Sequence, residues 1–155
     1  MWLRNLIAVG VLALAGCALT PAYGPGGTGT ALHGRVQLRA PADVDSFALN
    51  RRLEERLGPE QAAAYALNYR LTTASVAQGI TPDEVTTRYS LNGTADFTLT
   101  DASGAQVVAG QVSNFTSYST TGTTVATLAA EADARGRLAR MLADQVVTRL
   151  LAAVP

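Results

Sequence analysis

The sequence predicts an α+β fold in which two helices pack on one face of a four-stranded, mostly antiparallel (mixed) sheet. Two observations support this prediction. Apolar and polar residues alternate with a period of two in four segments, which is typical of strands, and apolar residues recur with a helical period in two others. The order is strand, helix, three strands, helix, and runs of strands with a helix at each joint indicate an α+β domain.

An export signal opens the chain. Arg4 places one positive charge ahead of an uninterrupted apolar run over residues 6–14. A helix that spans a bilayer needs roughly 20 apolar residues, so this run is too short to remain in a membrane as a span. A charged start, a short apolar segment and small residues after it describe a signal peptide that is removed, and we assign residues 1–16 to it.

The end of this signal, Leu14-Ala15-Gly16-Cys17, resembles the bacterial lipobox, in which the cysteine receives a diacylglycerol before cleavage. Cys17 is the only cysteine in the chain, and a buried unpaired thiol is the alternative interpretation. Two or more acyl chains, at about 0.8 kcal/mol for each buried CH₂, anchor a protein stably. Because Ala18 rather than an aspartate follows the cysteine, the sorting rule of many such bacteria predicts an outer-membrane, lipid-anchored protein on the periplasmic face.

A flexible tether, rich in Pro, Gly, Thr and Ala, is predicted from the acylated Cys17 to Ala31. It contains Gly24-Pro25-Gly26-Gly27-Thr28-Gly29, which is formally a G-x-G-x-x-G motif. A dinucleotide site requires a strand before this motif and a helix after it. An acylated terminus precedes it here and no helical pattern follows, so we interpret it as linker. Residues 32–155 are predicted to form a single α+β domain, large enough for one core.

The first strand is predicted over residues 32–38, where apolar and polar residues alternate. Asp43 or Asp45 is placed to cap the helix that follows, and Gly58-Pro59 ends this helix, since proline cannot continue it. The helix joins the first two strands, which can therefore run parallel. Its apolar stripe consists of Leu49, Leu53 and Leu57, with Phe47 on the flank.

Three further strands are predicted over 65–77, 85–100 and 106–117, with a loop at 79–83 and a hairpin turn at 101–104. The clean alternation of the middle strand predicts an antiparallel sheet that is covered on one face only. The looser alternation of the last strand is compatible with a β-bulge.

A Ser/Thr-rich loop over 117–124 leads to a long final helix that ends near Ala153. Small residues beside its apolar stripe, such as Ala139 and Ala143, allow close approach to another element. The stripe itself comprises Val125, Leu128, Ala132, Leu138, Leu142, Val146 and Leu150.

Composition excludes several functional classes. Twelve basic residues balance twelve acidic ones and none of them is a lysine, whereas a nucleic-acid binder normally has a basic surplus. His33 is the only histidine and the only cysteine is the predicted lipid carrier, so His/Cys metal sites are excluded. We expect no cofactor other than the covalent lipid on Cys17. His33 is predicted on the outward face of the first strand, and no cluster of acidic residues joins it, so we expect no enzymatic activity.

Arg70 and Arg88 are the candidate ligand-binding residues. Both are predicted on a sheet face rich in Thr, Ser and Asn, near the ends of adjoining strands that meet at the 78–84 loop. Arginine is the planar, bidentate donor that suits phosphate, so an anionic ligand could bind at this end of the sheet. Ordinary solvated arginines are the alternative interpretation.

Several local strings and the order of elements resemble the LptE family of outer-membrane lipoproteins in lipopolysaccharide (LPS) assembly. The strings are Cys17-x-Leu19-x-Pro21-x-Tyr23-Gly24, Leu53-Glu-Glu-Arg-Leu57-Gly58, Tyr65-x-Leu67-x-Tyr69, Thr87-Arg88-Tyr89, Gly104 with Gly110, and the final helix from Arg137-Leu138-Ala139 to Leu150. The resemblance implies a two-helix, four-strand domain lodged inside the large LptD β-barrel as plug and assembly partner, with LPS as its ligand. A polar sheet face suits a barrel lumen, which is polar in such proteins.

A second function class stays open at this point. A lipoprotein that activates a cell-wall synthase, or one that serves as an auxiliary subunit of a lipid transporter, would also have a lipobox, a tether and a small α+β domain. The partner distinguishes the two classes: a barrel protein in the first case, a soluble or inner-membrane enzyme or transporter in the second. Fold alone does not decide between them.

Overall fold

A computed structural model describes residue 24 and residues 27–80 and 86–154. The predicted signal peptide, the lipid carrier Cys17, most of the tether and the central part of the 79–83 loop lie outside the described residues. The elements are α2 (Thr28–Leu32), β1 (Val36–Leu38), α3 (Val44–Leu57), β2 (Tyr65–Ile80), β3 (Thr86–Asp101), β4 (Gln106–Ser119) and α4 (Thr124–Ala153).

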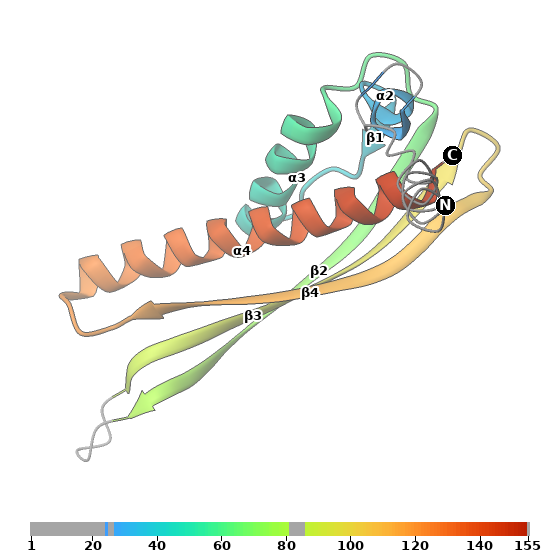
Figure 1. Cartoon of the computed structure of the whole chain (residues 1–155). Coiled ribbons are helices and arrows are strands. Elements are labelled where there is room, and N and C mark those ends of the chain that lie inside the picture. Colours follow the sequence, from blue (N-terminus) through green and yellow to red (C-terminus); the bar gives the residue numbers. More distant parts are fainter. Residues whose placement is uncertain (1–23, 25–26, 81–85, 155) are drawn as a thin grey trace, which may run out of the picture.

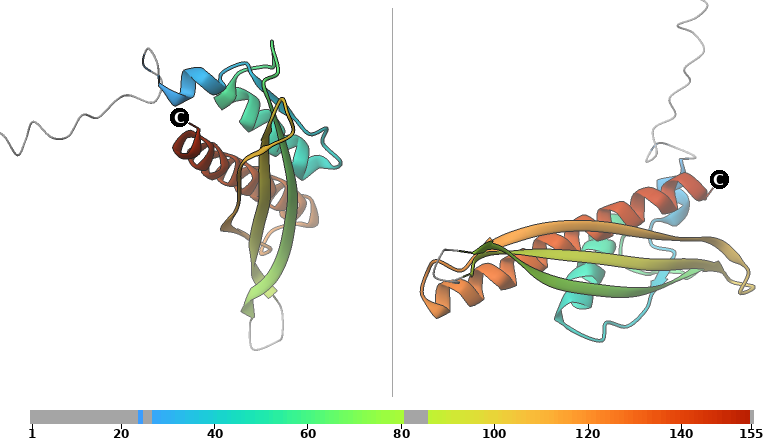
Figure 2. Two further views of the ribbon diagram at one scale, coloured as in Figure 1. Left: turned by 90° about the vertical axis from the view of Figure 1, so that its right-hand side faces the viewer. Right: turned by 90° about the horizontal axis from the view of Figure 1, so that it is seen from below.

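The four strands form one mixed sheet in the order β1-β2-β3-β4. β1 pairs with β2 in parallel, and the other two pairings are antiparallel, as the sequence predicts. α3 and α4 cover one face of this sheet and leave the other face bare (Figures 1 and 2). The predicted α+β fold class is therefore confirmed. The described residues contain three helices, because the short α2 adds to the two that were predicted.

The region before β1 differs from the prediction. Residues 28–32 form α2 where the tether was expected to continue, and the first strand is reduced to Val36–Leu38. Leu32 is the last residue of α2 and is fully buried in the core. It therefore matched the apolar positions of the predicted strand over 32–38, although it belongs to a helix. Gly34, with φ of +69°, then turns the chain into β1.

α3 begins and ends as its sequence predicts. Of the two candidate caps, Asp43 is the one used: its carboxylate accepts a hydrogen bond from the Ser46 N–H at 2.7 Å, and the Ser46 hydroxyl accepts from the Asp43 N–H at 2.9 Å. Hydrogen bonds from Ser46 hold the pKa of Asp43 below its usual value. At the other end Gly58 adopts φ of +77°, a left-handed value that a side chain would disfavour.

The core lies between β3 and the two long helices. Alternate β3 residues from Leu91 to Leu99 are buried, as the alternation predicts. Gly93 lets α4 approach closely, since a Cβ at this position would lie 2.8 Å from a methyl carbon of Leu138 and 3.0 Å from one of Leu142. The larger fully buried side chains are Leu32, Leu49, Leu53, Leu67, Leu91, Leu99, Leu138, Leu142, Leu150, Val146 and Val147.

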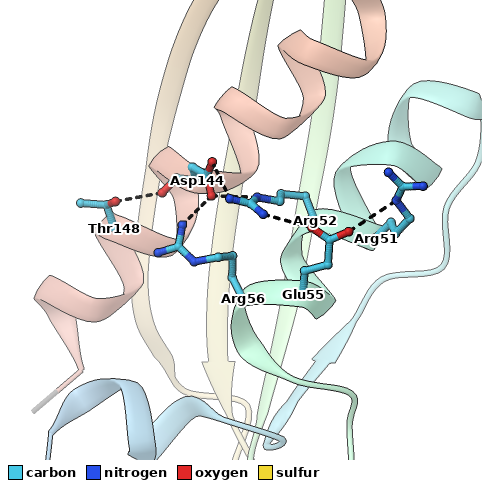
Figure 3. Close-up of polar contacts among 6 residues, drawn as sticks. All are labelled: Arg51, Arg52, Glu55, Arg56, Asp144 and Thr148. Carbon is cyan, nitrogen blue, oxygen red and sulfur yellow. Dashed lines mark hydrogen bonds and ion pairs between the residues drawn. The ribbon is translucent and has the colours of Figure 1, made fainter. Parts of the chain in front are cut away.

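Ion pairs fasten α3 to α4 beside this core (Figure 3). The Asp144 carboxylate of α4 accepts hydrogen bonds from Arg52 Nε at 3.0 Å and from Arg56 at 2.6 Å, both on α3. Hydrogen bonding to Asp144 first, and to Glu55 second, raises the pKa of Arg52. Along α4, the Thr148 hydroxyl donates to the Asp144 carbonyl at 2.8 Å.

The long strands run further than predicted at one end. β2 continues to Ile80 and β4 to Ser119, so Gly79 and Ile80 belong to a strand rather than to the predicted loop. The β2–β3 register shifts around Gly79. The strand was predicted to end at residue 77, just before this irregularity, but β2 continues through it. In β4, the predicted bulge is present: Thr100 pairs with Gln106 and Leu99 with Val108, which leaves Val107 as the extra residue.

The predicted stripe of α4 is buried over only part of its length. Burial starts at Ala134 and includes the four stripe positions from Leu138 to Leu150. Earlier in the helix, Val125 is 77% exposed and Leu128 62% exposed, and Ala132 is exposed as well. The predicted helix is confirmed over this first third, but its apolar stripe is exposed there. Within the described residues, no helix is both long and apolar enough to cross a membrane.

Candidate functional site

The candidate site is the end of the sheet that lies beside the start of α4. We call it the far end, and it comprises residues 77–79 of β2, 86–90 of β3 and 117–119 of β4, with the connection 120–123 to α4. Arg88 pairs in register with Gly79 on one side and with Ser119 on the other. The far end therefore gathers three strands and the first turns of α4, which projects past α3 (Figure 1).

Arg88 lies in a shallow polar depression at the far end. Gln78, Ser119 and Thr121 line it with Arg88. The Ser119 and Thr121 hydroxyl oxygens are 3.0 Å apart, and Ser119 is also within 3.3 Å of the Thr87 carbonyl oxygen, so the hydroxyl groups are ordered beside the guanidinium. Among the described residues no carboxylate forms an ion pair with Arg88. A guanidinium next to fixed hydroxyl donors is suited to a phosphate or carboxylate group.

A groove of mixed polarity lies at the same end, between the sheet and α4. Tyr89 and Tyr118 stack with ring centroids 5.6 Å apart and an angle of 17° between their planes. These rings and Leu128 line the groove, whose volume is about 560 Å³, while Glu131 and threonine hydroxyls supply its polar lining. The far end thus offers an anion-binding group on the bare face and, on the opposite face under α4, a groove lined by the stacked tyrosines.

The second predicted site residue, Arg70, lies elsewhere. It pairs in register with Asp96, and it precedes Gly79, the partner of Arg88, by nine residues, or roughly 30 Å of extended strand. The expectation that Arg70 and Arg88 meet at one loop is therefore wrong. The reason is the length of the strands: both arginines lie on the bare face, but the hairpin separates them along its axis. Arg70 instead borders a different depression, with Arg39 and Asp43.

No catalytic or metal-binding arrangement appears in the part of the chain that the structure describes. His33 is exposed and lies against Gly58, and no three His, Cys, Asp or Glu side chains gather there to bind a metal ion.

Two residues of the groove were missed in the sequence. Tyr118 was placed in a loop and Leu128 in a buried stripe. One signal could have found them: the strand pairing continues past Ser117, which places Tyr118 opposite Tyr89.

The comparisons with known proteins agree with this architecture. The family model described as "LptE: Lipopolysaccharide-assembly" matches residues 34–150. The chain belongs to the LptE family. This match covers all four strands of the sheet, α3, and α4 as far as Leu150, and so includes both the far end and the core. A search of curated proteins found no match.

Solved structures of bacterial lipoproteins share the fold. A lipoprotein from Caulobacter crescentus CB15 is 26% identical, with 80% of this chain and 92% of that chain covered and a TM-score of 0.67. Rare lipoprotein B from Shewanella oneidensis is 11% identical, with 76% and 92% covered and a TM-score of 0.59. A minor lipoprotein from Acinetobacter baumannii is 18% identical, with 76% and 89% covered and a TM-score of 0.57. At such low identity the last two establish the fold alone.

Proposed function

We propose that this LptE-family chain is an outer-membrane lipoprotein that assembles with an LptD-like β-barrel, plugs it, and helps to insert LPS into the outer membrane. Its covalent lipid on Cys17 anchors it on the periplasmic face. The observation that carries the proposal is the family match over residues 34–150, which spans the whole sheet and both long helices. The family is one of assembly proteins, which supports a binding role rather than an enzymatic one.

The bare face of the sheet supports a position inside a barrel. Its side chains are largely Thr, Ser and Asn, and they alternate with the buried residues along three strands. On β3, Asn92 and Asp96 are exposed, and Asp96 accepts a hydrogen bond from Gln111 of β4 at 2.6 Å. Such a hydrated, hydroxyl-rich face suits the polar lumen of an outer-membrane barrel.

The far end supports direct contact with LPS. The lipid carries phosphate groups and acyl chains, so contact with it calls for a cationic donor and an apolar surface. Arg88 supplies the donor, and the stacked Tyr89 and Tyr118 with Leu128 supply the apolar surface. Both lie at one end of the same three strands, Arg88 on the bare face and the groove on the opposite face under α4, so one lipid that contacts both must extend around this end of the sheet.

The partner is tested by affinity purification of the full lipoprotein from detergent-solubilised outer membranes through a C-terminal tag, followed by mass spectrometry. We expect a large β-barrel protein in near-equal amount. Recovery with a cell-wall synthase or with a lipid transporter instead would contradict the proposal and establish the second function class.

The ligand contact is tested by Arg88→Ala, with binding of purified LPS measured in vitro. Loss of a charge-assisted bidentate donor is expected to weaken binding by about tenfold. The thermal unfolding midpoint is expected to stay unchanged, because Arg88 is exposed and forms no ion pair among the described residues.

Arg70→Ala is the matched control. Arg70 lies on the same bare face as Arg88, but it pairs in register with Asp96, away from the far end. A site confined to the far end predicts that this variant binds LPS like the wild type. Equal losses for both variants would indicate a ligand that extends along the bare face, and unchanged affinity for Arg88→Ala would refute the contact.

A further inference from the structure

The outer edge of β2 is open over most of its length. β1 pairs with β2 only from Tyr65 to Leu67, and the chain then leaves the sheet toward α3. Beyond that point β2 continues for thirteen more residues to Ile80 as an edge strand. An edge strand presents unpaired N–H and C=O groups, to which another extended chain can bind.

Two hydrogen bonds show which residues of β2 point outward. The Leu67 carbonyl accepts from the Arg39 N–H at 3.1 Å, and the Tyr69 carbonyl accepts from the Arg39 guanidinium at 3.0 Å. In an antiparallel strand the N–H and C=O of one residue point to the same side, and the side alternates. The outward residues after Tyr69 are therefore odd-numbered, and they include Thr73, Ser75 and Ala77.

No backbone partner reaches these three residues within the described chain. The Thr73 hydroxyl donates a hydrogen bond to the Asp45 carboxylate at 3.4 Å, and this side-chain contact leaves the outward backbone groups of Thr73 without a partner in the described chain. Residues 74–78 are exposed, and Val76 remains 47% exposed. We call the segment Thr73–Ala77 the open edge.

The opposite edge of the sheet, on β4, is partly blocked by the chain itself. The same alternation turns Phe115 and Ser117 outward there. The Phe115 N–H is already bonded to the Asn114 side-chain oxygen at 2.8 Å, and the Ser117 carbonyl accepts from Arg137 of α4 at 3.2 Å. Outward backbone groups are therefore bonded within the chain on the β4 edge, but not along Thr73–Ala77 of the β2 edge.

The open edge also lacks the usual protection against strand addition. Natural edge strands are commonly guarded by Lys or other charged side chains, by proline or by a bulge. Residues 71–78 read Leu-Thr-Thr-Ala-Ser-Val-Ala-Gln, with no charge and no proline, and the register irregularity comes only after Ala77. Small neutral side chains on both faces leave room for a neighbouring strand.

We propose that the open edge docks an extended segment of the barrel partner, which joins the sheet as a fifth strand beside β2. This inference rests on the proposed function, because it assigns the protein partner to a particular surface. The chemistry of the edge defines the occupant: three outward residues offer three donors and three acceptors at strand spacing, and an extended backbone is complementary to them.

Ser75→Pro tests the proposal in the full lipoprotein, purified through its C-terminal tag as above. Proline removes the outward N–H of Ser75 without removing a hydrogen bond of the β2–β3 ladder, since Ser75 points away from β3. Ser113→Pro is the matched control, because Ser113 is an exposed, outward-pointing serine on the opposite edge. We expect about tenfold less barrel protein with Ser75→Pro and the wild-type amount with Ser113→Pro.

Hydrogen exchange of the wild-type complex gives a second measurement that needs no variant. The amides of Thr73, Ser75 and Ala77 are expected to exchange more slowly in the complex than in the free lipoprotein. The amide of Phe115, already bonded within the chain, is the internal reference.

The outcomes separate the two proposals. If the wild-type protein recovers no barrel protein, the proposed function fails. If it recovers the barrel, but Ser75→Pro recovers as much and the open-edge amides are unprotected, only the docking edge is refuted. A free lipoprotein that sediments as a dimer, and as a monomer after Ser75→Pro, would also overturn the inference, because the edge would then pair with a second copy of the chain.

Discussion

The last two-thirds of α4 and its first third lie along the same sheet, yet they have different surroundings. From Ala134 to Leu150 the apolar positions are buried between β3, β4 and α3, and Asp144 is held by two arginines of α3. Before Ala134 the same helix exposes Val125 and Leu128, and Leu128 lines the groove with Tyr89 of β3 and Tyr118 of β4. The helical pattern is continuous across this boundary, but burial is not.

The difference follows from the lengths of the two helices. α3 has 14 residues and is about 21 Å long, whereas α4 has 30 residues and is about 45 Å long. A stripe of apolar residues is buried only where side chains surround it on both sides. The uncovered third of α4 is therefore available for the groove at the far end. Periodicity identifies a helix and its apolar face, and neighbouring elements decide how much of that face is buried.

The sharpest test of this comparison is a pair of identical truncations in α4. Leu142→Ala removes a fully buried side chain over Gly93 and is expected to lower the free energy of unfolding by about 3 kcal/mol. Leu128→Ala removes a side chain that is 62% exposed and is expected to cost less than about 0.5 kcal/mol. Urea denaturation measures both. Similar losses would show that the first third of α4 is packed after all.

Charge removal on the two parts of α4 gives a smaller contrast. Asp144→Asn removes the carboxylate that Arg52 and Arg56 share, both of which are about one-third exposed, and is expected to cost about 1.5 kcal/mol. Asp133→Asn breaks an exposed pair with Arg137 within one helix and is expected to cost about 0.3 kcal/mol. Added salt should reduce both effects. An equal cost for the two variants would contradict the role of Asp144 in joining α3 to α4.

A third test concerns the start of α3. Asp43→Ala removes the N-cap and is expected to cost about 1 kcal/mol at pH 6. Because the pKa of Asp43 is lower in the folded state than its usual 3.8, its contribution is complete above pH 4 and declines as the pH falls through the folded-state pKa. Thermal unfolding at pH 6 and pH 3 measures this, with Asp43→Asn as the control that keeps a capping group but does not titrate. A difference between Asp43→Ala and wild type that grows at pH 3 would contradict the assignment.

Local chemistry is what could be predicted from the sequence. Asp43 and Gly58 mark the ends of α3 because the helix start needs a side-chain oxygen that accepts a backbone N–H, and the residue after the last turn adopts a left-handed conformation. The alternation from Leu91 to Leu99 identified the buried face of β3 because successive strand residues point to opposite faces. The strings quoted for the LptE family were also sufficient for the family assignment.

Tertiary structure decided the features that depend on distant segments. Leu32 could not be assigned to a helix, because five residues carry too little periodicity, and its burial comes from the core around it. The separation of Arg70 from Arg88 depends on the length and register of the β2–β3 hairpin. The groove under Leu128 exists because α3 is shorter than α4, and the open edge of β2 exists because β1 ends at Leu38. A side chain's type is fixed by the sequence, but its exposure depends on which other elements reach it.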